Sequence, residues 1–221
     1  MFFHKINCVA WIAGVDEAGR GPVIGPMVVA LVALDESRIG ILENIGVKDS
    51  KMLSPSRRER IRKILEEILE YTAIRVVQPR EIDEAVEGIS SENLNSLEAT
   101  VIADLVLQAL KKIGLSRVYV DSPDPVAERF GRILATRINK DIVVVAENHA
   151  DIKYPVVSAA SIIAKSEREK IISELKRVYG DFGSGYPSDP KTREFLKRLL
   201  ENNRELPPIV RRSWKTLSRL M

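Results

Sequence analysis

Two short apolar runs near the start of the chain constrain its fold more than any other feature of the sequence. Residues 9–15 and 26–34 are rich in β-branched residues, and a loop of glycines and prolines separates them. Runs of this kind are typical of buried strands, and glycine and proline mark the turns between them. The acidic pair Asp16 and Glu17 follows the first run. We therefore predict two neighbouring strands, the first ending in two adjacent carboxylates.

The rest of the chain alternates between strand and helix patterns. Three further strands are predicted at residues 73–78, 117–121 and 142–146, and helices at residues 54–70, 91–113, 125–138 and 156–179, from residue 189, and near Trp214. Strands in hairpin order followed by strands that alternate with helices indicate an α/β fold with a mixed sheet. Beyond residue 180 no strand pattern remains. We predict an α/β domain at residues 1–180 and a basic helical region at residues 181–221.

Composition and charge suit a globular protein with an anionic partner. The chain has 221 residues, 45% of them hydrophobic, so it can bury a core in one domain. Its net charge is +3, but residues 191–221 hold nine Lys and Arg against three Glu, which gives +6 there and −3 in the remainder. This asymmetry predicts an anionic partner contacted by the C-terminal part, or a solvated basic helix face; the charge alone leaves both open.

Cysteine use and hydropathy indicate a protein of the reducing cytoplasm. The only cysteine, Cys8, lies in an apolar run where we expect it to fill the core, and one cysteine allows no disulfide within the chain. No apolar stretch approaches the roughly 20 residues that span a bilayer. The first apolar run is interrupted by His4, Lys5 and Asn7, unlike a signal peptide. We expect no membrane association.

The glycine loop resembles a dinucleotide-binding fingerprint only in part. Gly19 and Gly21 follow a strand, but the third glycine, Gly25, comes one residue late. Pro22 and Pro26 occupy positions where the fingerprint requires a helix, and the chain continues as a strand instead. The sequence therefore disfavours a nucleotide-binding fold.

Acidic residues at several predicted strand ends favour a metal site. Asp16 and Glu17 end one strand, Asp121 ends another, and Asp151 lies just beyond a third. A single aspartate at a strand end is more often a turn former or a helix cap. Several carboxylates forced together repel one another, and a hard divalent cation removes that penalty. Two such cations about 4 Å apart can act on both oxygens of a phosphodiester. The four acids beside a glycine loop therefore predict phosphoryl chemistry.

Six blocks, in order, resemble the ribonuclease HII family in its archaeal form. They cover nearly the whole chain: DEAGRGPVIGP at 16–26, GVKDSKMLSPSRRE at 46–59, VYVDSPD at 118–124, HADIKYPVVSAASIIAK at 149–165, GDFGSGYPSDPKTR at 180–193 and RRSWKT at 211–216. The resemblance implies a ribonuclease H-like mixed sheet flanked by helices, with a C-terminal helical region. It also implies an endonuclease that cleaves the RNA strand of RNA/DNA hybrids and cuts at single ribonucleotides in duplex DNA.

The resemblance assigns roles to particular residues. It implies that Asp16, Glu17, Asp121 and Asp151 hold two divalent ions, Mg²⁺ or Mn²⁺, and that the products carry 5′-phosphate and 3′-hydroxyl ends. The sequence Gly19-Arg20-Gly21 would read the 2′-hydroxyl at the junction between ribonucleotide and deoxyribonucleotide, and Tyr186 would stack on the neighbouring sugar. Glycines suit this role because they allow the backbone to approach a ribose closely, and the 2′-hydroxyl is the group that separates RNA from DNA.

Basic and hydroxyl side chains outside the acid set are expected to hold neighbouring phosphates and so to fix the register on the duplex. These expected phosphate contacts are Lys48, Ser50, Lys51, Arg211, Arg212 and Lys215. Trp214, between two of them, is expected to anchor the last helix in the core.

The chain departs from the family pattern in two places. His149, after Asn148, stands where the family often has His-Lys, and we give it no catalytic role. The sequence WKTLSRLM, at residues 214–221, lacks the glutamine and paired aromatic residues of a clamp-binding tail, so we expect no sliding-clamp partner and a monomer. Two rival hypotheses are a non-catalytic hybrid-binding module, which the intact acids disfavour, and an exonuclease or recombinase that cuts all-DNA, which the Gly-Arg-Gly loop disfavours.

Overall fold

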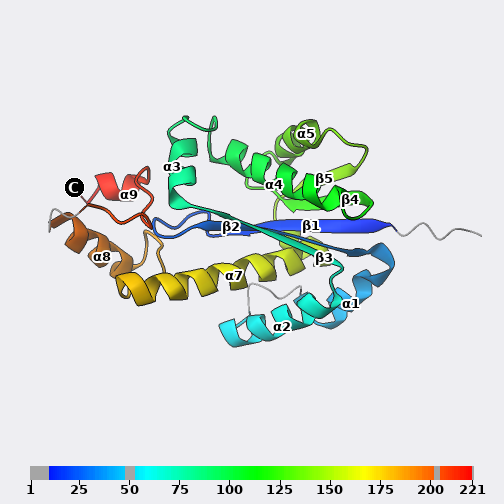
Figure 1. Cartoon of the computed structure of the whole chain (residues 1–221), viewed down its shortest axis with the longest axis horizontal. Helices are drawn as coiled ribbons and strands as arrows, with labels where there is room; N and C mark the ends of the chain where they lie inside the picture. The colour runs from blue at the N-terminus through cyan, green and yellow to red at the C-terminus, as the bar shows by residue number, and fades with distance from the viewer. Residues whose placement is uncertain (1–9, 48–52, 202–204, 221) are drawn as a thin grey trace, which may run out of the picture.

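The computed structural model describes residues 10–47, 53–201 and 205–220, and a five-stranded mixed sheet lies at its centre (Figure 1). The strand order is β3-β2-β1-β4-β5. The first three strands in that order are antiparallel, whereas β4 runs parallel to β1 and to β5. The strands are β1 (Trp11–Ala18), β2 (Met27–Asp35), β3 (Tyr71–Val77), β4 (Leu115–Asp121) and β5 (Val143–Glu147). All five predicted strands are confirmed; the expectation for Cys8 lies outside the described residues.

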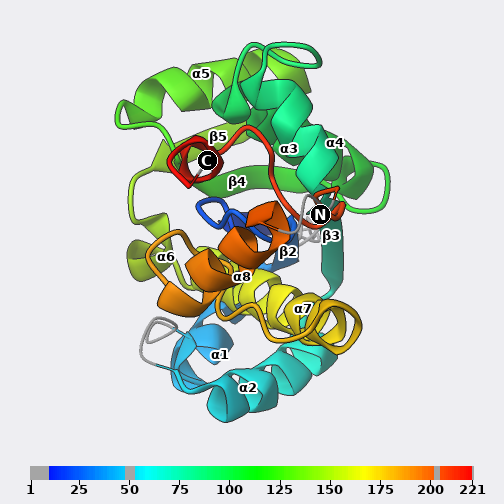
Figure 2. The ribbon, with the colours of Figure 1, turned by 90° about the vertical axis from the view of Figure 1, so that its left-hand side faces the viewer.

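Helices cover both faces of the sheet, so the domain has three layers (Figures 1 and 2). One face packs against α4 and α5, and the other against α7, α1 and α2; each interface is an apolar core that includes alternating residues of β1 and β2. The helices are α1 (Ile39–Asn44), α2 (Pro55–Ile68), α3 (Pro79–Val86), α4 (Leu94–Leu110), α5 (Ala127–Ile138), α6 (Ala150–Lys153), α7 (Pro155–Tyr179), α8 (Pro190–Glu201) and α9 (Lys215–Ser218). The mixed α/β fold expected from the sequence is confirmed.

The long helix α7 begins unusually close to β1. A Cβ atom added at Gly14 would lie 2.3 Å from the backbone of Val156, so only glycine allows this approach. Small residues continue the contact, because the side chains of residues 158–161 are all buried. The start of α7 is therefore fixed directly beneath the strand that carries Asp16 and Glu17.

The C-terminal region packs against the loop between β1 and β2. A third apolar cluster joins Val23 and Ile24 of that loop to Phe182, Leu196 and Val210. Among the described residues after 180 there is no strand, as predicted, and the chain makes one isolated bridge to the loop, between Ile24 and Val210. None of the helices in the described ranges is long and apolar enough to cross a membrane.

Several short elements were not predicted. The 3-10 helix η1 (Glu36–Arg38), α1 and α6 have only three, six and four residues, too few for a helical periodicity to show in the sequence. The helix α3 did carry a start signal, because Pro79 is its first residue and the carboxylate of Glu81 accepts a hydrogen bond from the amide of Gln78, as in a capping box. By contrast, the predicted start of α2 is confirmed: the hydroxyl of Ser54 accepts a hydrogen bond from the amide of Arg57.

Candidate active site

Three of the four predicted acidic residues lie at one edge of the sheet. Asp16 and Glu17 are near the end of β1, and Asp121 is the last residue of β4. These strands are parallel and Val15 pairs with Val120, so the next residues of each strand emerge side by side. The register of one strand pair thus brings together carboxylates that are more than a hundred positions apart in the sequence.

The fourth acid reaches the same edge through a short helix. After β5 the chain forms α6, and the amide of Ala150 donates a hydrogen bond of 2.8 Å to Oδ1 of Asp121. Asp151 is the next residue, and only 2% of its surface is exposed. His149, just before α6, is exposed and has a left-handed backbone with φ of 59°. Asp151 is thus buried next to the residue that contacts Asp121.

Burial and mutual repulsion act together on Asp16. Burial raises the pKa of this carboxyl well above its ordinary value, and the charges of Glu17 and Asp121 raise it further. The nearby Ser161 hydroxyl and Lys165 ammonium, both on α7, lower the pKa of Asp16 and so oppose the shift. Asp16 therefore belongs to a crowded acidic cluster, and Lys165 on α7 supplies positive charge on its side of that cluster.

Glu17 meets a different set of groups. Burial raises the pKa of its carboxyl, followed by repulsion from Glu98 and Asp121, while the charge of Arg20 lowers it. Successive side chains of a strand point to opposite faces, which accounts for the different neighbours: Asp16 meets α7, whereas Glu17 meets Glu98 of α4. The charge of Asp121 raises the pKa of both acids, so Asp121 lies near both.

The donor atoms fit a hard divalent cation. All the predicted ligands are carboxylate oxygens, the class that Mg²⁺ and related ions prefer. Among the described residues, no group of three or more His, Cys, Asp or Glu side chains is arranged so that it could hold a metal ion by itself. Magnesium usually takes one or two carboxylates and completes its shell with waters and substrate phosphates. A crowded cluster that leaves coordination positions to substrate and water suits such an ion.

A cleft of about 410 Å³ opens beside the acids, between the glycine loop and α7. Glu17 lines it together with Gly19, Arg20 and Gly21, and Tyr186 lines it as well. Tyr186 is 42% exposed, and a Cβ atom at Gly21 would lie 3.7 Å from its ring. The structure therefore brings together the two elements expected to read the sugar, although they are far apart in the sequence. The other residues lining the cleft are Ala18, Arg58, Lys165, Arg168 and Glu169.

The glycine loop is held by side-chain donors from distant segments. Gly19 has φ of +85°, and a side chain there would collide with Arg168. The guanidinium of Arg211 donates to the carbonyls of Gly25, Arg20 and Gly19 at 2.9, 2.7 and 2.5 Å. Trp214 donates its indole N–H to the carbonyl of Gly21 at 3.0 Å. The backbone of the loop is thus fixed by side chains of the C-terminal region.

The expected phosphate contact by Arg211 is wrong. Its side chain is fully buried, and its donors serve the loop carbonyls. Burial lowers the pKa of this guanidinium, and the neighbouring charge of Arg168 lowers it further. A basic pair in a sequence reads as solvent-exposed, but only Arg212 of this pair is exposed. Trp214 does anchor the C-terminal segment, as expected, because it packs against two apolar clusters.

The remaining expected phosphate contacts lie elsewhere. Arg212 and Lys215 are exposed but line a separate depression beside Trp214, outside the cleft. Lys48, Ser50 and Lys51 fall outside the described residues.

The sequence did not reveal Glu98, Lys165 or Arg168 as neighbours of the site. Glu98 is fully buried and pairs with Arg20. It occupies the apolar stripe of α4, in step with Val101, Ile102 and Leu105, which are also buried. A charged residue in the middle of an apolar helix face was the available signal, because such residues are almost never fully buried unless they are paired.

Known proteins share the sequence and the fold of this chain. The family model described as "Ribonuclease HII" matches residues 13–217. A ribonuclease HII of Thermofilum pendens is 50% identical over 209 residues, which covers 95% of this chain and 98% of that protein. The crystal structure of ribonuclease H2 from Pyrococcus horikoshii superposes with a TM-score of 0.84 at 45% identity, over 95% of this chain and 96% of that one. The ribonuclease HII of Archaeoglobus fulgidus, solved in complex with PCNA, matches with a TM-score of 0.84 at 46% identity and the same coverage.

Proposed function

Because the chain belongs to the ribonuclease HII family, we propose that Asp16, Glu17, Asp121 and Asp151 are its catalytic metal-binding residues. The protein is an endoribonuclease that cleaves the RNA strand of RNA/DNA hybrids and cuts at ribonucleotides in DNA, and its chemistry depends on divalent metal ions. Neither the non-catalytic module nor the DNA exonuclease considered from the sequence is retained.

One observation supports this assignment above all others. At the edge of a parallel strand pair, the charges of Glu17 and Asp121 raise the pKa of the buried Asp16, and the charge of Asp121 also raises the pKa of Glu17. Carboxylates brought this close together repel one another, and a function that uses bound cations accounts for keeping such a cluster in the fold. Holding divalent cations next to a substrate cleft is that function.

The acidic and basic side chains around the cleft would have different roles in cleavage. When bound, two divalent cations supply the positive charge that activates a water molecule and stabilises the departing 3′-oxygen. The four carboxylates fix where that charge sits. Lys165 and Arg58 line the cleft beside Glu17 and would hold phosphates of the cleaved strand, which sets its register. The products expected are 5′-phosphate and 3′-hydroxyl ends.

The glycine loop and the tyrosine beside it would select the sugar. The backbone of Gly19 to Gly21 would contact the 2′-hydroxyl, and Tyr186 would stack on the adjacent sugar. A reader built from backbone and one aromatic ring has no groups directed at base edges, so cleavage should depend on the sugar and little on the base sequence.

Replacing Asp121 by asparagine tests the assignment. Asp121→Asn keeps the side-chain shape, but it removes one negative charge between Asp16 and Glu17. We expect cleavage of a duplex with one embedded ribonucleotide to slow by about two to three orders of magnitude, the scale of losing one electrostatic contributor to catalysis. Asp104→Asn, an exposed position on α4, is the matched control and should cleave at the parental rate. An Asp121→Asn protein that cleaves as fast as this control would refute the assignment.

The proposed function also includes the metal ion, the oligomeric state, the location in the cell and the protein partners. We propose Mg²⁺ or Mn²⁺, a monomer, and action in the cytoplasm; rates measured across concentrations of each ion would rank the two. The expectation of no sliding-clamp partner finds no support in the comparisons, since the Archaeoglobus fulgidus relative was solved with PCNA. Titration of the protein with a purified clamp ring would measure this interaction directly.

A further inference from the structure

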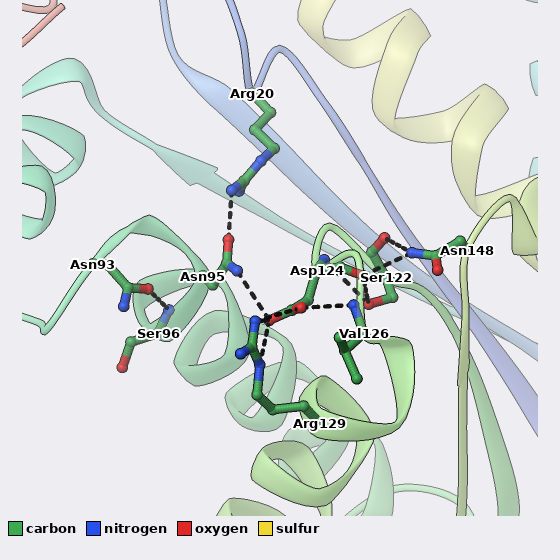
Figure 3. A network of polar contacts seen from close by, with 9 residues as sticks. All are labelled: Arg20, Asn93, Asn95, Ser96, Ser122, Asp124, Val126, Arg129 and Asn148. Carbon is green, nitrogen blue, oxygen red and sulfur yellow. Dashed lines mark hydrogen bonds and ion pairs between the residues drawn. The ribbon is translucent and has the colours of Figure 1, made fainter.

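The side chain of Arg20 lines the cleft, but its guanidinium is paired with residues of α4. Its guanidinium forms an ion pair with Glu98, and its second terminal nitrogen donates to Oδ1 of Asn95 at 2.6 Å. Both partners lie on α4, one helical turn apart. Figure 3 shows Arg20 reaching from the loop to Asn95. We call Asn95 and Glu98 the Arg20 clamp.

This contact is the side-chain anchor of an otherwise glycine-rich loop. Glycine leaves the backbone conformationally free, and the flanking residues Gly19 and Gly21 have no side chains to hold them. Arg211 fixes the carbonyl groups of this segment from one direction. The Arg20 clamp fixes it from α4, so the orientation of the peptide groups between Gly19 and Gly21 is set from two sides.

The clamp also touches the acidic cluster. Glu98 is fully buried, and its charge is among the groups that act on Glu17. Its second carboxylate oxygen, Oε1, accepts no hydrogen bond from the described residues. A buried carboxylate is costly unless it is paired, so the pairing with Arg20 is what the fold provides for Glu98.

Asn95 extends the connection to the strand ends. Its amide approaches Oδ2 of Asp124 at 3.4 Å, and Asp124 also receives the guanidinium of Arg129. The side chain of Asn148 donates to the carbonyls of Ser122 and Asp124 at 3.1 and 2.8 Å (Figure 3). This network therefore runs from the glycine loop to residues that adjoin Asp121 and precede Asp151.

We propose that the Arg20 clamp is a specificity-determining positioning element, which holds the glycine loop in its reading conformation and ties it to the acidic cluster. The proposal rests on the proposed function, because it takes the loop to be the sugar reader. Arg20 acts as an anchor here, with its charge neutralised by Glu98, and does not serve as a phosphate ligand.

A double-mutant cycle tests the proposal. The variants are Glu98→Gln, which keeps the shape of the side chain, Asn95→Ala, Arg20→Ala, and each clamp variant combined with Arg20→Ala. For each variant, fluorescence anisotropy in EDTA gives two dissociation constants. One is for a duplex with a single ribonucleotide, and the other is for an all-DNA duplex of the same base sequence. Their ratio is the sugar preference, which is defined without cleavage.

The expected result is that either clamp variant alone lowers the sugar preference by about tenfold, the lower end of effects from residues that support a site from outside. In the Arg20→Ala background the same substitutions should change it by less than about twofold, because the group they position is gone. Equal losses in both backgrounds, or no loss from either clamp variant, would overturn the proposal.

Controls separate a loss of sugar preference from misfolding of a variant and from failure of the proposed catalytic assignment. Thermal unfolding identifies a variant that fails to fold; if Glu98→Gln does so, Asn95→Ala, which is only half-buried, decides the question. Asp121→Asn is assayed for cleavage in parallel. Normal cleavage by Asp121→Asn would refute the assignment of the catalytic residues. The binding measurements would still show whether the Arg20 clamp sets the sugar preference.

Discussion

The acidic cluster and the glycine loop, which we call the acidic wall and the reading wall of the site, are built in different ways. The acidic wall is assembled by the sheet: the parallel register of β1 and β4 alone places Asp16 and Glu17 beside Asp121. The reading wall is a loop without regular structure, held by Arg211 and Trp214 from the C-terminal region. The comparison teaches that the chemistry depends on the core fold, while the selection of substrate depends on contacts with a separate part of the chain.

A substitution under the acidic wall should have the largest effect. In Gly14→Ala the new methyl group would meet the backbone of Val156 at 2.3 Å, and neither β1 nor α7 can move without disturbing the core. We expect the free energy of unfolding to fall by about 3 kcal/mol or more, at the upper end for overpacked cores, with loss of cleavage. Chemical denaturation measures the change. Gly114→Ala, where a methyl group would meet open space, is the control.

Removing Arg211 should affect the reading wall selectively. Arg211→Met fills a similar volume but leaves three loop carbonyls without their charged donor. Each such hydrogen bond contributes about 1.5–3 kcal/mol to stability. Part of this loss is offset, because the substitution also removes the cost of burying the guanidinium charge. We expect a net loss of about 2 kcal/mol in stability and a weaker preference for ribonucleotide-containing duplex. If Arg211→Met keeps the parental preference for ribonucleotide-containing duplex, the C-terminal region does not hold the glycine loop in its reading conformation.

Two glycines of the loop should respond differently to alanine. Gly19 has a positive φ, which costs a residue with a side chain about 1–2 kcal/mol, and its Cβ would also approach the carbonyl of Pro26 at 2.8 Å. At Gly21 a Cβ would make only an ordinary contact with Tyr186. Gly19→Ala should therefore unfold at a lower temperature, whereas Gly21→Ala should keep its stability and lose sugar preference. Equal melting temperatures would contradict this distinction.

The smallest effect is expected outside both walls. Arg212 is exposed and lies beyond the cleft. If its contact with a flanking phosphate is real, Arg212→Ala should reduce the log–log dependence of duplex binding on salt by about 0.9, and the sugar preference should stay the same. Anisotropy titrations at several salt concentrations measure the slope. An unchanged slope would exclude Arg212 from the interface.

The sequence was informative about one wall and poor about the other. Asp16, Glu17 and Asp121 could be placed because strands show in apolar runs and strand ends are visible in the sequence. The position of Tyr186 beside Gly21 came only from family resemblance, since no local pattern reports a contact between residues so far apart. Arg211 was misassigned because burial of a single arginine depends on the tertiary packing of the loop.

The most direct test of the account is a crystal of the protein soaked in Mn²⁺ and measured at the manganese absorption edge. The account predicts anomalous peaks within about 2.5 Å of carboxylate oxygens of Asp16, Glu17 and Asp121, with Asp151 completing the set. Manganese bound only away from these four residues, at a concentration that supports cleavage, would contradict it.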